Sequence, residues 1–396
     1  MIKNILTLIL IFTLQISVFA QFQDSVSTGS SNVNDVYYSF SNGIIKSTPN
    51  NNWDLAFEIT GFTASILVNH VKGIELYQTP FAISNWSNFD TSGLKNFKKM
   101  YNSEFSWSLG AFNRHTDNNY DLGWGTYNPE NHVVAGDSIF LIKFADGSLK
   151  KIQIINLLSG VYNFKYSSID GNGEKIISIA KSNFKNKNFA YFAFANDTII
   201  DREPLNTDWD IVFTKYSAFI PQRYSVAGVW TNKNTKCAEA KNVSKEITNS
   251  TGFNFSDTNS IIGYDWKKYN ATLGQYTITD SLVYFVKNQK NNYWKLYFTG
   301  YKGGTVGTYY FTKYAITASV SKIENTNCRI YPNPANTLLN IDSEAKHVKY
   351  EISTSNGLNL MSGNDNIIDI SSLVRGYYFI KIYTENGFTA VKFLKY

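Results

Sequence analysis

Side chains with an imidazole or a thioether are few in this chain of 396 residues, and they are unevenly distributed. The histidines are His70, His115, His132 and His347, and beyond Met1 the methionines are Met100 and Met361. Imidazole nitrogen and thioether sulfur are ligands that proteins use for transition metals. Neither residue type occurs from Val133 to Lys346, so the long middle of the chain cannot supply such a ligand.

Two of the histidines lie in polar segments that predict loops. His115 lies in RHTDNN, and His132 lies in PENHVVAG just before an alternating strand. His115 and His132 are therefore plausible ligands at loop tips, with His70 and Met100 as further candidates. The alternative is that each loop histidine is merely solvated. For His70, in LVNHVKG, we expect an exposed position at the end of a strand.

The sequence favours a protein that is not an enzyme. It contains no glycine-rich phosphate loop, no nucleophile elbow and no paired His/Cys metal spacing. Trp53-Asp54 and Trp209-Asp210 could suggest two catalytic carboxylates. Both pairs recur with the same apolar flanks, however, and a repeated position in the fold explains that recurrence more simply.

The Trp-Asp pairs belong to a repeat that covers most of the chain. Segments 37–57 and 191–213 each contain an aromatic strand, an Asn turn, a polar loop with Pro, and Trp-Asp-aliphatic-x-Phe. Further matching segments follow in the same order. We therefore predict two copies of one domain, at residues 33–178 and 186–318.

Each copy is predicted to be mainly β. The segment SIFLIKFADGSLKKIQIINL alternates around an Asp-Gly turn, which is typical of a hairpin. Aromatic residues make up 16% of the chain and favour strands. Apolar residues at helical spacing predict one short helix around 94–105. The expected fold class is two tandem antiparallel β-sandwich-like domains plus a small C-terminal β-sandwich domain at 328–396.

The N-terminal segment predicts export. Residues 1–20 contain Lys3, an apolar run and the small residue Ala20, which are typical of a secretory signal peptide; a retained anchor is the alternative. No later apolar stretch approaches the length of a membrane span, so no transmembrane segment is expected in the mature chain. Cys237 and Cys328 could pair in an oxidising compartment or stay free.

The charge of the chain argues against one class of partner. The formal net charge is +6, and the basic residues form neither a continuous stripe nor a known nucleic-acid-binding module. A nucleic-acid partner is therefore not expected.

The C-terminal tail carries a specific set of motif residues. They are Tyr331, Pro332, Asn333 and Pro334 at its start, Gly357 in a hairpin turn, then Gly376, Lys392 and Lys395. With these residues the tail resembles the type A sorting domain of the type IX secretion system of Bacteroidetes. The resemblance implies the type IX secretion machinery as a partner, removal of the tail, and a cell-surface or secreted location.

The two repeats carry a second pattern, which is fuller in the second copy. It consists of Trp209–Phe213, Gly263–Trp266, Tyr284–Lys287 and Tyr293–Thr299. In the first copy, Leu122-Gly123 stands in place of the second Trp. The repeats resemble the HmuY family of haemophore-like proteins. The resemblance implies a non-catalytic binding protein with haem, or a related tetrapyrrole, as its ligand. If haem binds, we expect it in the first copy through His115 and His132.

A different binding function remains open. The chain contains 27 Tyr and 8 Trp, whose rings stack on porphyrins and on sugars alike. The alternative to haem is therefore a haem-free binding or adhesion module for a host protein or a glycan. Equally, many of these rings are expected to be core residues and cross-strand pairs.

Overall fold

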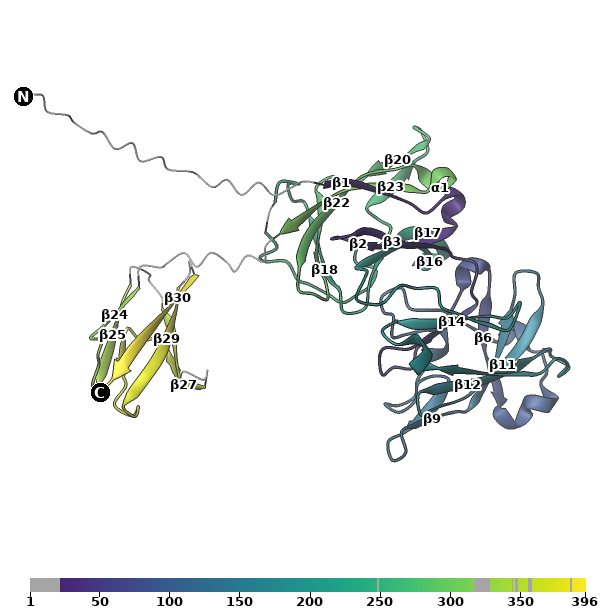
Figure 1. The fold of residues 1–396 in the computed structure, drawn as a ribbon, viewed down its shortest axis with the longest axis horizontal. Coiled ribbons are helices and arrows are strands. Elements are labelled where there is room, and N and C mark those ends of the chain that lie inside the picture. Colours follow the sequence, from purple (N-terminus) through teal and green to yellow (C-terminus); the bar gives the residue numbers. More distant parts are fainter. Residues whose placement is uncertain are drawn as a thin grey trace, which may run out of the picture. The chain divides into compact units, whose positions relative to one another are not determined.

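The computed structural model describes residues 22–247, 249–316, 328–343, 345, 348–354, 358–384 and 387–396. The chain forms two compact units, Met1–Thr317 and Ala318–Tyr396, which are described separately below. Both consist mainly of antiparallel strands, so the predicted fold class is confirmed (Figure 1). The predicted signal peptide, His347 and Gly357 lie outside the described residues.

The first unit contains two sandwiches, and we call the first of them lobe one. Its smaller sheet has the strand order β15-β14-β4-β5, and its larger sheet has the order β13-β12-β11-β10-β6-β7. The strands of the smaller sheet are β4 (Leu55–Glu58), β5 (Ile66–Val68), β14 (Phe189–Ala193) and β15 (Thr198–Ile200). Along this path the larger sheet contains β6 (Glu75–Ala82), β7 (Lys98–Met100), β10 (Ser138–Lys143), β11 (Leu149–Leu158), β12 (Val161–Ser167) and β13 (Lys175–Ala180). The hairpin of β8 (Gly125–Asn128) and β9 (Val133–Gly136) joins the same sheet through β11.

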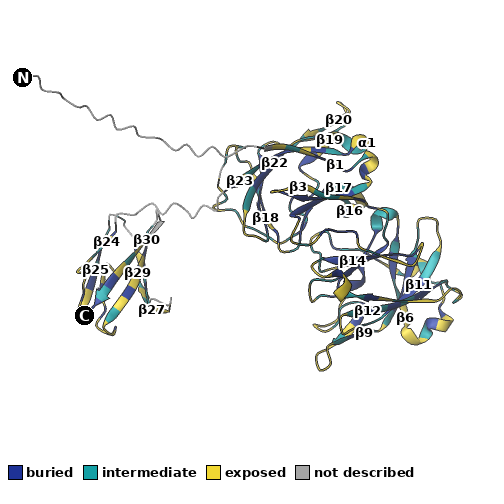
Figure 2. Cartoon of the chain, in the orientation of Figure 1, coloured by how far each residue is buried: buried dark blue, intermediate teal, exposed yellow. Residues whose placement is uncertain are grey.

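The second sandwich, lobe two, repeats this arrangement. Its sheets have the orders β17-β16-β2-β3 and β1-β23-β22-β21-β18. The first contains β2 (Asn34–Ser39), β3 (Gly43–Pro49), β16 (Ile211–Ile220) and β17 (Gln222–Thr231). The second contains β1 (Phe22–Ser27), β18 (Lys236–Lys241), β21 (Leu282–Lys287), β22 (Tyr293–Tyr301) and β23 (Thr308–Ile316). Each lobe buries its own apolar core between its two sheets, as the dark blue strands of Figure 2 show.

The lobes do not follow the repeat boundaries predicted at 33–178 and 186–318. Strands β2 and β3, at the start of the first repeat, belong to lobe two, where β2 pairs with β16. Strands β14 and β15, at the start of the second repeat, belong to lobe one, where β14 pairs with β4. Lobe one is therefore continuous in sequence and is inserted between β3 and β16 of lobe two. Figure 1 shows the purple strands β2 and β3 beside β16 and β17.

The Trp-Asp pairs hold these hairpins in place. The Asp54 carboxylate accepts a hydrogen bond from Phe194 N, and the Asp210 carboxylate accepts one from Phe40 N, both at 2.7 Å. Trp53 packs edge-on against Tyr191, and Trp209 packs in the same way against Tyr37. Asp54 and Asp210 are buried. The pairs are thus equivalent structural positions in the two lobes.

The second Trp of the pattern is present in both lobes, which corrects the sequence alignment. Trp124 and Trp266 are fully buried in equivalent cores, and each directly precedes the first strand of a hairpin. Those first strands are β8 (Gly125–Asn128) and β19 (Lys267–Asn270), and the second strands are β9 (Val133–Gly136) and β20 (Gln275–Ile278). Leu122-Gly123 therefore lengthens the loop before Trp124 and does not replace the tryptophan.

The helix predicted around 94–105 is wrong. This segment has a single 3-10 turn at Leu94–Asn96, followed by strand β7. Strand β7 pairs with β6, and this pairing places Met100 opposite Leu76 in the core of lobe one. Tertiary pairing outweighs the local helical spacing here.

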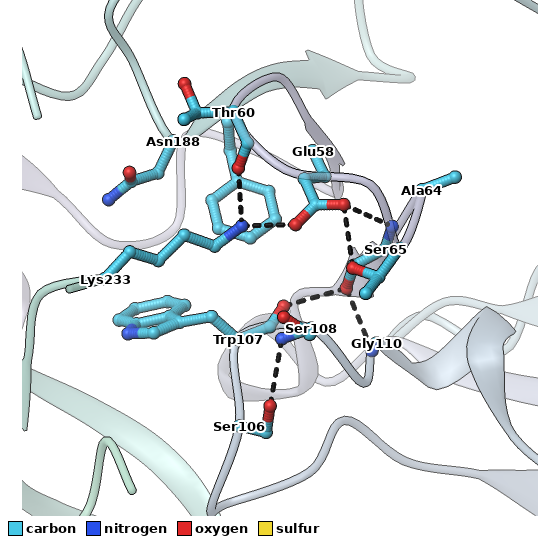
Figure 3. Close-up of polar contacts among 12 residues, drawn as sticks. Glu58, Thr60, Ala64, Ser65, Ser106, Trp107, Ser108, Gly110, Asn188 and Lys233 are labelled. Carbon is cyan, nitrogen blue, oxygen red and sulfur yellow. Dashed lines mark hydrogen bonds and ion pairs between the residues drawn. The ribbon is translucent and has the colours of Figure 1, made fainter. Parts of the chain in front are cut away.

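A buried polar contact joins the lobes (Figure 3). Lys233, which follows β17 of lobe two, pairs with Glu58 in β4 of lobe one and donates a hydrogen bond of 2.9 Å to Thr60 O. The side chain of Glu58 is 1% exposed, so the ammonium of Lys233 neutralises a charge that water does not reach. Trp107 of lobe one also donates from Nε1 to Thr231 O at 2.8 Å.

The second unit is a small sandwich with a core of its own. One sheet contains β24 (Arg329–Tyr331), β25 (Leu338–Asp342) and β28 (Ile367–Asp369). The other contains β26 (Lys349–Ser353), β27 (Asn359–Gly363), β29 (Gly376–Thr384) and β30 (Gly387–Lys395). This agrees with the predicted C-terminal β domain.

Candidate functional site

Two large cavities of the first unit lie on lobe two, beside the β19–β20 hairpin. Two cavities of about 580 and 830 Å³ adjoin each other and share Tyr276, Tyr301 and Gly304 in their walls. We call them together the tyrosine groove. Its tyrosines are Tyr224, Tyr264, Tyr269, Tyr276, Tyr301 and Tyr310, and its lysines are Lys215, Lys267 and Lys302.

The groove exists because the β19–β20 hairpin stays separate from the main sheet of lobe two. In lobe one the equivalent hairpin joins its sheet, since β9 pairs with β11 through Ala135 and Val134. In lobe two the hairpin forms a two-stranded sheet of its own. In lobe two β20 does not pair with β22 in the way that β9 pairs with β11 in lobe one. The larger cavity lies at this position, between the hairpin and the end of β22.

Two further differences between the lobes border the same groove. Strands β16 and β17 form a hairpin of ten residues per strand, whereas their lobe-one counterparts β4 and β5 have four and three. Between β22 and β23 the chain inserts the short helix α1 (Gly303–Val306), where lobe one has only a tight turn between β11 and β12. Residues of both additions line the groove.

The hairpin is anchored at its base by the core. Trp266 stacks on Phe298 with ring centroids 3.7 Å apart. On the other side, Val229 N donates to Gly263 O at 2.9 Å, and Gly263 N donates back to Val229 O at 3.1 Å. A Cβ on Gly228 would lie 2.6 Å from Gly263 O, so this close approach requires glycine. These contacts fix the direction in which Tyr264 and Lys267 leave the core.

Lys267 is a nearly buried cation in the wall of the groove. Its side-chain ammonium donates hydrogen bonds to Ala227 O at 2.6 Å and Tyr264 O at 3.3 Å. The Nζ atom lies 4.3 Å from the Trp266 ring centroid and 4.8 Å from that of Tyr301. Burial lowers the pKa of Lys267 to about 7, and the nearby Asp265 carboxylate only partly opposes that effect. The equivalent residue in lobe one is Gly125.

Three phenols of the groove, those of Tyr264, Tyr276 and Tyr301, stay protonated near neutral pH. Burial raises the pKa of Tyr264, Tyr276 and Tyr301 above the ordinary value of tyrosine. A protonated phenol both donates and accepts hydrogen bonds, and its ring offers a flat apolar face. The groove can therefore bind a ligand that has flat faces and hydroxyl groups.

The structure places the predicted ligands His115 and His132 on separate loops of lobe one. His115 is exposed, and its Nδ1 lies 3.0 Å from the ammonium of Lys98. His132 is exposed in the β8–β9 turn, where its Nδ1 lies 2.6 Å from the Tyr127 hydroxyl. Neither histidine lines the tyrosine groove or the two cavities around Trp107 and Asn288. Partial burial and the charges of Lys98 and Arg114 lower the pKa of His115.

The side chains of the further candidates, His70 and Met100, already contact other parts of lobe one. Met100 is 1% exposed within the core of lobe one. The expectation that His70 is an exposed strand-end residue is wrong, because the chain turns back over its ring after β5. Its Nδ1 lies 2.9 Å from Ile74 O, and its Nε2 accepts a hydrogen bond of 3.4 Å from Asn102 N. Both ring nitrogens therefore have protein partners.

His70 predicts acid sensitivity of the first unit. Burial lowers the pKa of His70 to about 4, so below pH 6.5 the unfolded chain takes up a proton that the folded chain resists. The free energy of unfolding should fall as the pH falls from 6.5 to 4, by on the order of 2–3 kcal/mol. Urea unfolding of the wild type and His70→Gln at pH 7 and pH 4.5 tests this. An equal loss of stability in both proteins would contradict the prediction.

Sequence reasoning missed the tyrosine groove, although one signal was present. The many tyrosines could be core or surface residues, and only the structure shows which rings line a cavity. The detectable signal was a longer connection in copy two, between the segments that form β22 and β23, than between the equivalent segments of copy one. Cys237 is buried in the core of lobe two, and Cys328 is buried in the core of the second unit.

The motif residues of the tail join the two ends of the second unit. The Asn333 side chain donates to Lys392 O at 3.0 Å and accepts from Leu394 N at 3.1 Å. Lys392 places its ammonium 3.9 Å from the Tyr377 ring centroid, and Lys395 forms a bridge with Ala335. Tyr331 ends β24 and Gly376 begins β29. The start and the end of the tail thus depend on each other for their structure.

Comparison with protein families identifies this second unit. Residues 329–395 match the model of a secretion system C-terminal sorting domain. This domain marks the chain as a protein that the type IX secretion system exports to the cell surface or the medium, and the secretion machinery is its partner. A search of curated proteins found no match to the chain.

Two further searches cover the described residues only. None of the helices in that part of the chain is long and apolar enough to cross a membrane. The same residues contain no group of three or more His, Cys, Asp or Glu side chains that could hold a metal ion.

Proposed function

We propose that residues 22–316 form a non-catalytic binding protein of the HmuY type, which binds its ligand in the tyrosine groove of lobe two. The single observation that carries the proposal is the difference between the lobes. The two lobes have equivalent cores and share most of their strand order, yet a hairpin is detached, a second hairpin is extended and a helix is inserted in lobe two alone. All three changes border one groove.

The exposed rings around the groove support a binding role. Tyr224 is 66% exposed, Tyr269 is 60% exposed and Phe219, at the tip of the β16–β17 hairpin, is 62% exposed. Large rings that water reaches on a monomer frequently mark an interaction site when they gather in one place. Held on strands, such rings provide contact area at a low cost in conformational entropy.

Haem binding in lobe one stays a prediction from the family resemblance. Its two ligands would be His115 and His132, both of which are exposed and placed on loops. A haemin titration followed at the Soret band tests it directly. A low-spin spectrum that the double change His115→Ala/His132→Ala abolishes would place the ligand in lobe one rather than in the groove.

The groove itself is tested by removing an exposed ring. The chain without its predicted signal peptide should bind members of a panel of neutral oligosaccharides, acidic oligosaccharides and haemin, measured by titration calorimetry. Tyr224→Ala should weaken this binding about tenfold, because a stacked ring contributes roughly 1 kcal/mol or more. Tyr377→Ala, which removes an exposed ring of the sorting domain, is the matched control. Binding that both variants retain, or the absence of binding to every probe, would overturn the proposal.

A further inference from the structure

Resting on the proposed function, we propose that the ligand of the tyrosine groove is an acidic saccharide. Its sugar rings would lie against Tyr224 and Tyr276, and its carboxylate would pair with the ammonium of Lys267. The arguments come from the charges in the groove, the arrangement of its rings and the polar groups between them.

The charged side chains that line the groove are all cationic. They are Lys215, Lys267 and Lys302, and no Asp or Glu lines either cavity. Lys267 is the best placed of the three, since it is 9% exposed while it lines the cavity. An ammonium has three donors, and two of them meet the carbonyls of Ala227 and Tyr264. No partner is found for its third donor among the described residues, and we assign that donor to an anion in the groove.

The ring of Tyr276 is held in place by its neighbours. It packs edge-on against Tyr269 at 5.3 Å and against Tyr301 at 4.9 Å between ring centroids. These contacts restrict the rotamers that the ring can adopt before a ligand binds. Binding a sugar face to such a ring therefore orders few side chains, and less affinity is lost to conformational entropy.

The polar lining favours a saccharide over a tetrapyrrole. Asn32, Ser225, Gln275 and Thr299 line the cavities and can bond to sugar hydroxyl groups. A haem iron would need an imidazole, a thioether or a phenolate. Lobe two has neither of the first two, and burial holds the phenols of Tyr276 and Tyr301 in their protonated form by raising the pKa of each.

The environment of Lys267 adds a proton-linked signature. The titratable groups around its ammonium are Asp265, Tyr264, Tyr276, Tyr301 and Tyr309, with Lys215 across the cavity. Burial lowers the pKa of Lys267 to about 7, whereas a bound carboxylate would raise that pKa again. Binding at pH 8 should therefore take up a proton, which calorimetry in two buffers of different ionisation enthalpy measures.

The experiment compares an oligogalacturonate with its carboxyl-reduced, neutral counterpart on the chain that starts at residue 21. We expect the acidic probe to bind at least about tenfold more tightly, in line with one hydrogen bond to a charged group. Lys267→Gln should remove this preference. Lys268→Gln, an exposed change at the next position of β19, is the matched control and should keep it. A thermal scan checks that Lys267→Gln is folded, and Tyr224→Ala provides an independent variant of the groove.

The outcomes separate this inference from the proposed function. Equal binding of the acidic and neutral probes, lost in Tyr224→Ala, would keep the groove as the site and overturn the acidic class. If haemin binds and neither saccharide does, the assignment of a saccharide as the ligand would also be overturned. An acidic preference that survives in Lys267→Gln would show that Lys267 does not bind the carboxylate. If neither saccharide nor haemin binds, the proposed function itself fails.

Discussion

A fragment of residues 51–208 is expected to fold alone, whereas a fragment of residues 33–178 is not. The first contains every strand of lobe one, including β14 and β15. The second lacks those two strands and with them Ala190, Phe192 and Phe194 of the core. It also carries β2 and β3, whose partner β16 is absent. Thermal unfolding followed by near-ultraviolet circular dichroism should be cooperative for 51–208 only.

The same topology predicts that the two mismatched halves complement each other. Residues 33–178 and 186–318 each hold a hairpin that completes the other half's sandwich. When they are co-expressed, they should form a one-to-one complex, because each then buries the apolar face of the other. Size-exclusion chromatography with light scattering measures this. Two separate, cooperatively unfolding monomers would show that the repeats, rather than the lobes, are the folding units.

Lys233→Met is expected to destabilise the first unit by about 3–5 kcal/mol, because it removes the ammonium that forms an ion pair with the buried carboxylate of Glu58. Thr63 and Ser65 donate hydrogen bonds to Glu58, but neither supplies a charge. Urea unfolding monitored by tryptophan fluorescence measures the change in the free energy of unfolding.

Two further variants show whether the loss comes from the unpaired charge. Lys241→Met breaks the ion pair with Glu239, in which the lysine side chain is 62% exposed, and should cost less than about 1 kcal/mol. The double change Glu58→Gln/Lys233→Met should recover part of the stability, since it removes both charges together. If Lys233→Met cost no more than Lys241→Met, the buried pair would not stabilise the contact between the lobes.

Local pattern explains how much of the fold could be predicted. Alternation along SIFLIK and its partner strand gives β10 and β11, because one face of each strand must be buried. The same reasoning fails at 94–105, where the spacing of apolar residues suits a helix and the pairing of β7 with β6 decides the structure. In the tail, Asn333 belongs to a recognisable motif because its contacts with β30 are specific to that domain.

The candidate site was less accessible to sequence reasoning. His115 and His132 were chosen for their chemistry, but nothing in a sequence shows whether two loops share a cavity. Lys267 carries no motif, and its properties arise from the carbonyls of Ala227 and Tyr264 and from the surrounding rings. Those neighbours come from distant parts of the chain, so the environment of this lysine exists only after folding.

The sequence by itself determined the strands, the duplication and the sorting domain, because each depends on residues close together in the chain. The tertiary structure alone decided which hairpin completes which lobe. The β2–β3 and β14–β15 hairpins are so alike that either could pair with either Trp-Asp strand, and local pattern cannot choose between them. It also decided that β9 joins the larger sheet of lobe one, while β20 pairs only with β19 and stays outside the main sheets of lobe two. That difference depends on long-range pairing, and it is what opens a groove in one lobe only.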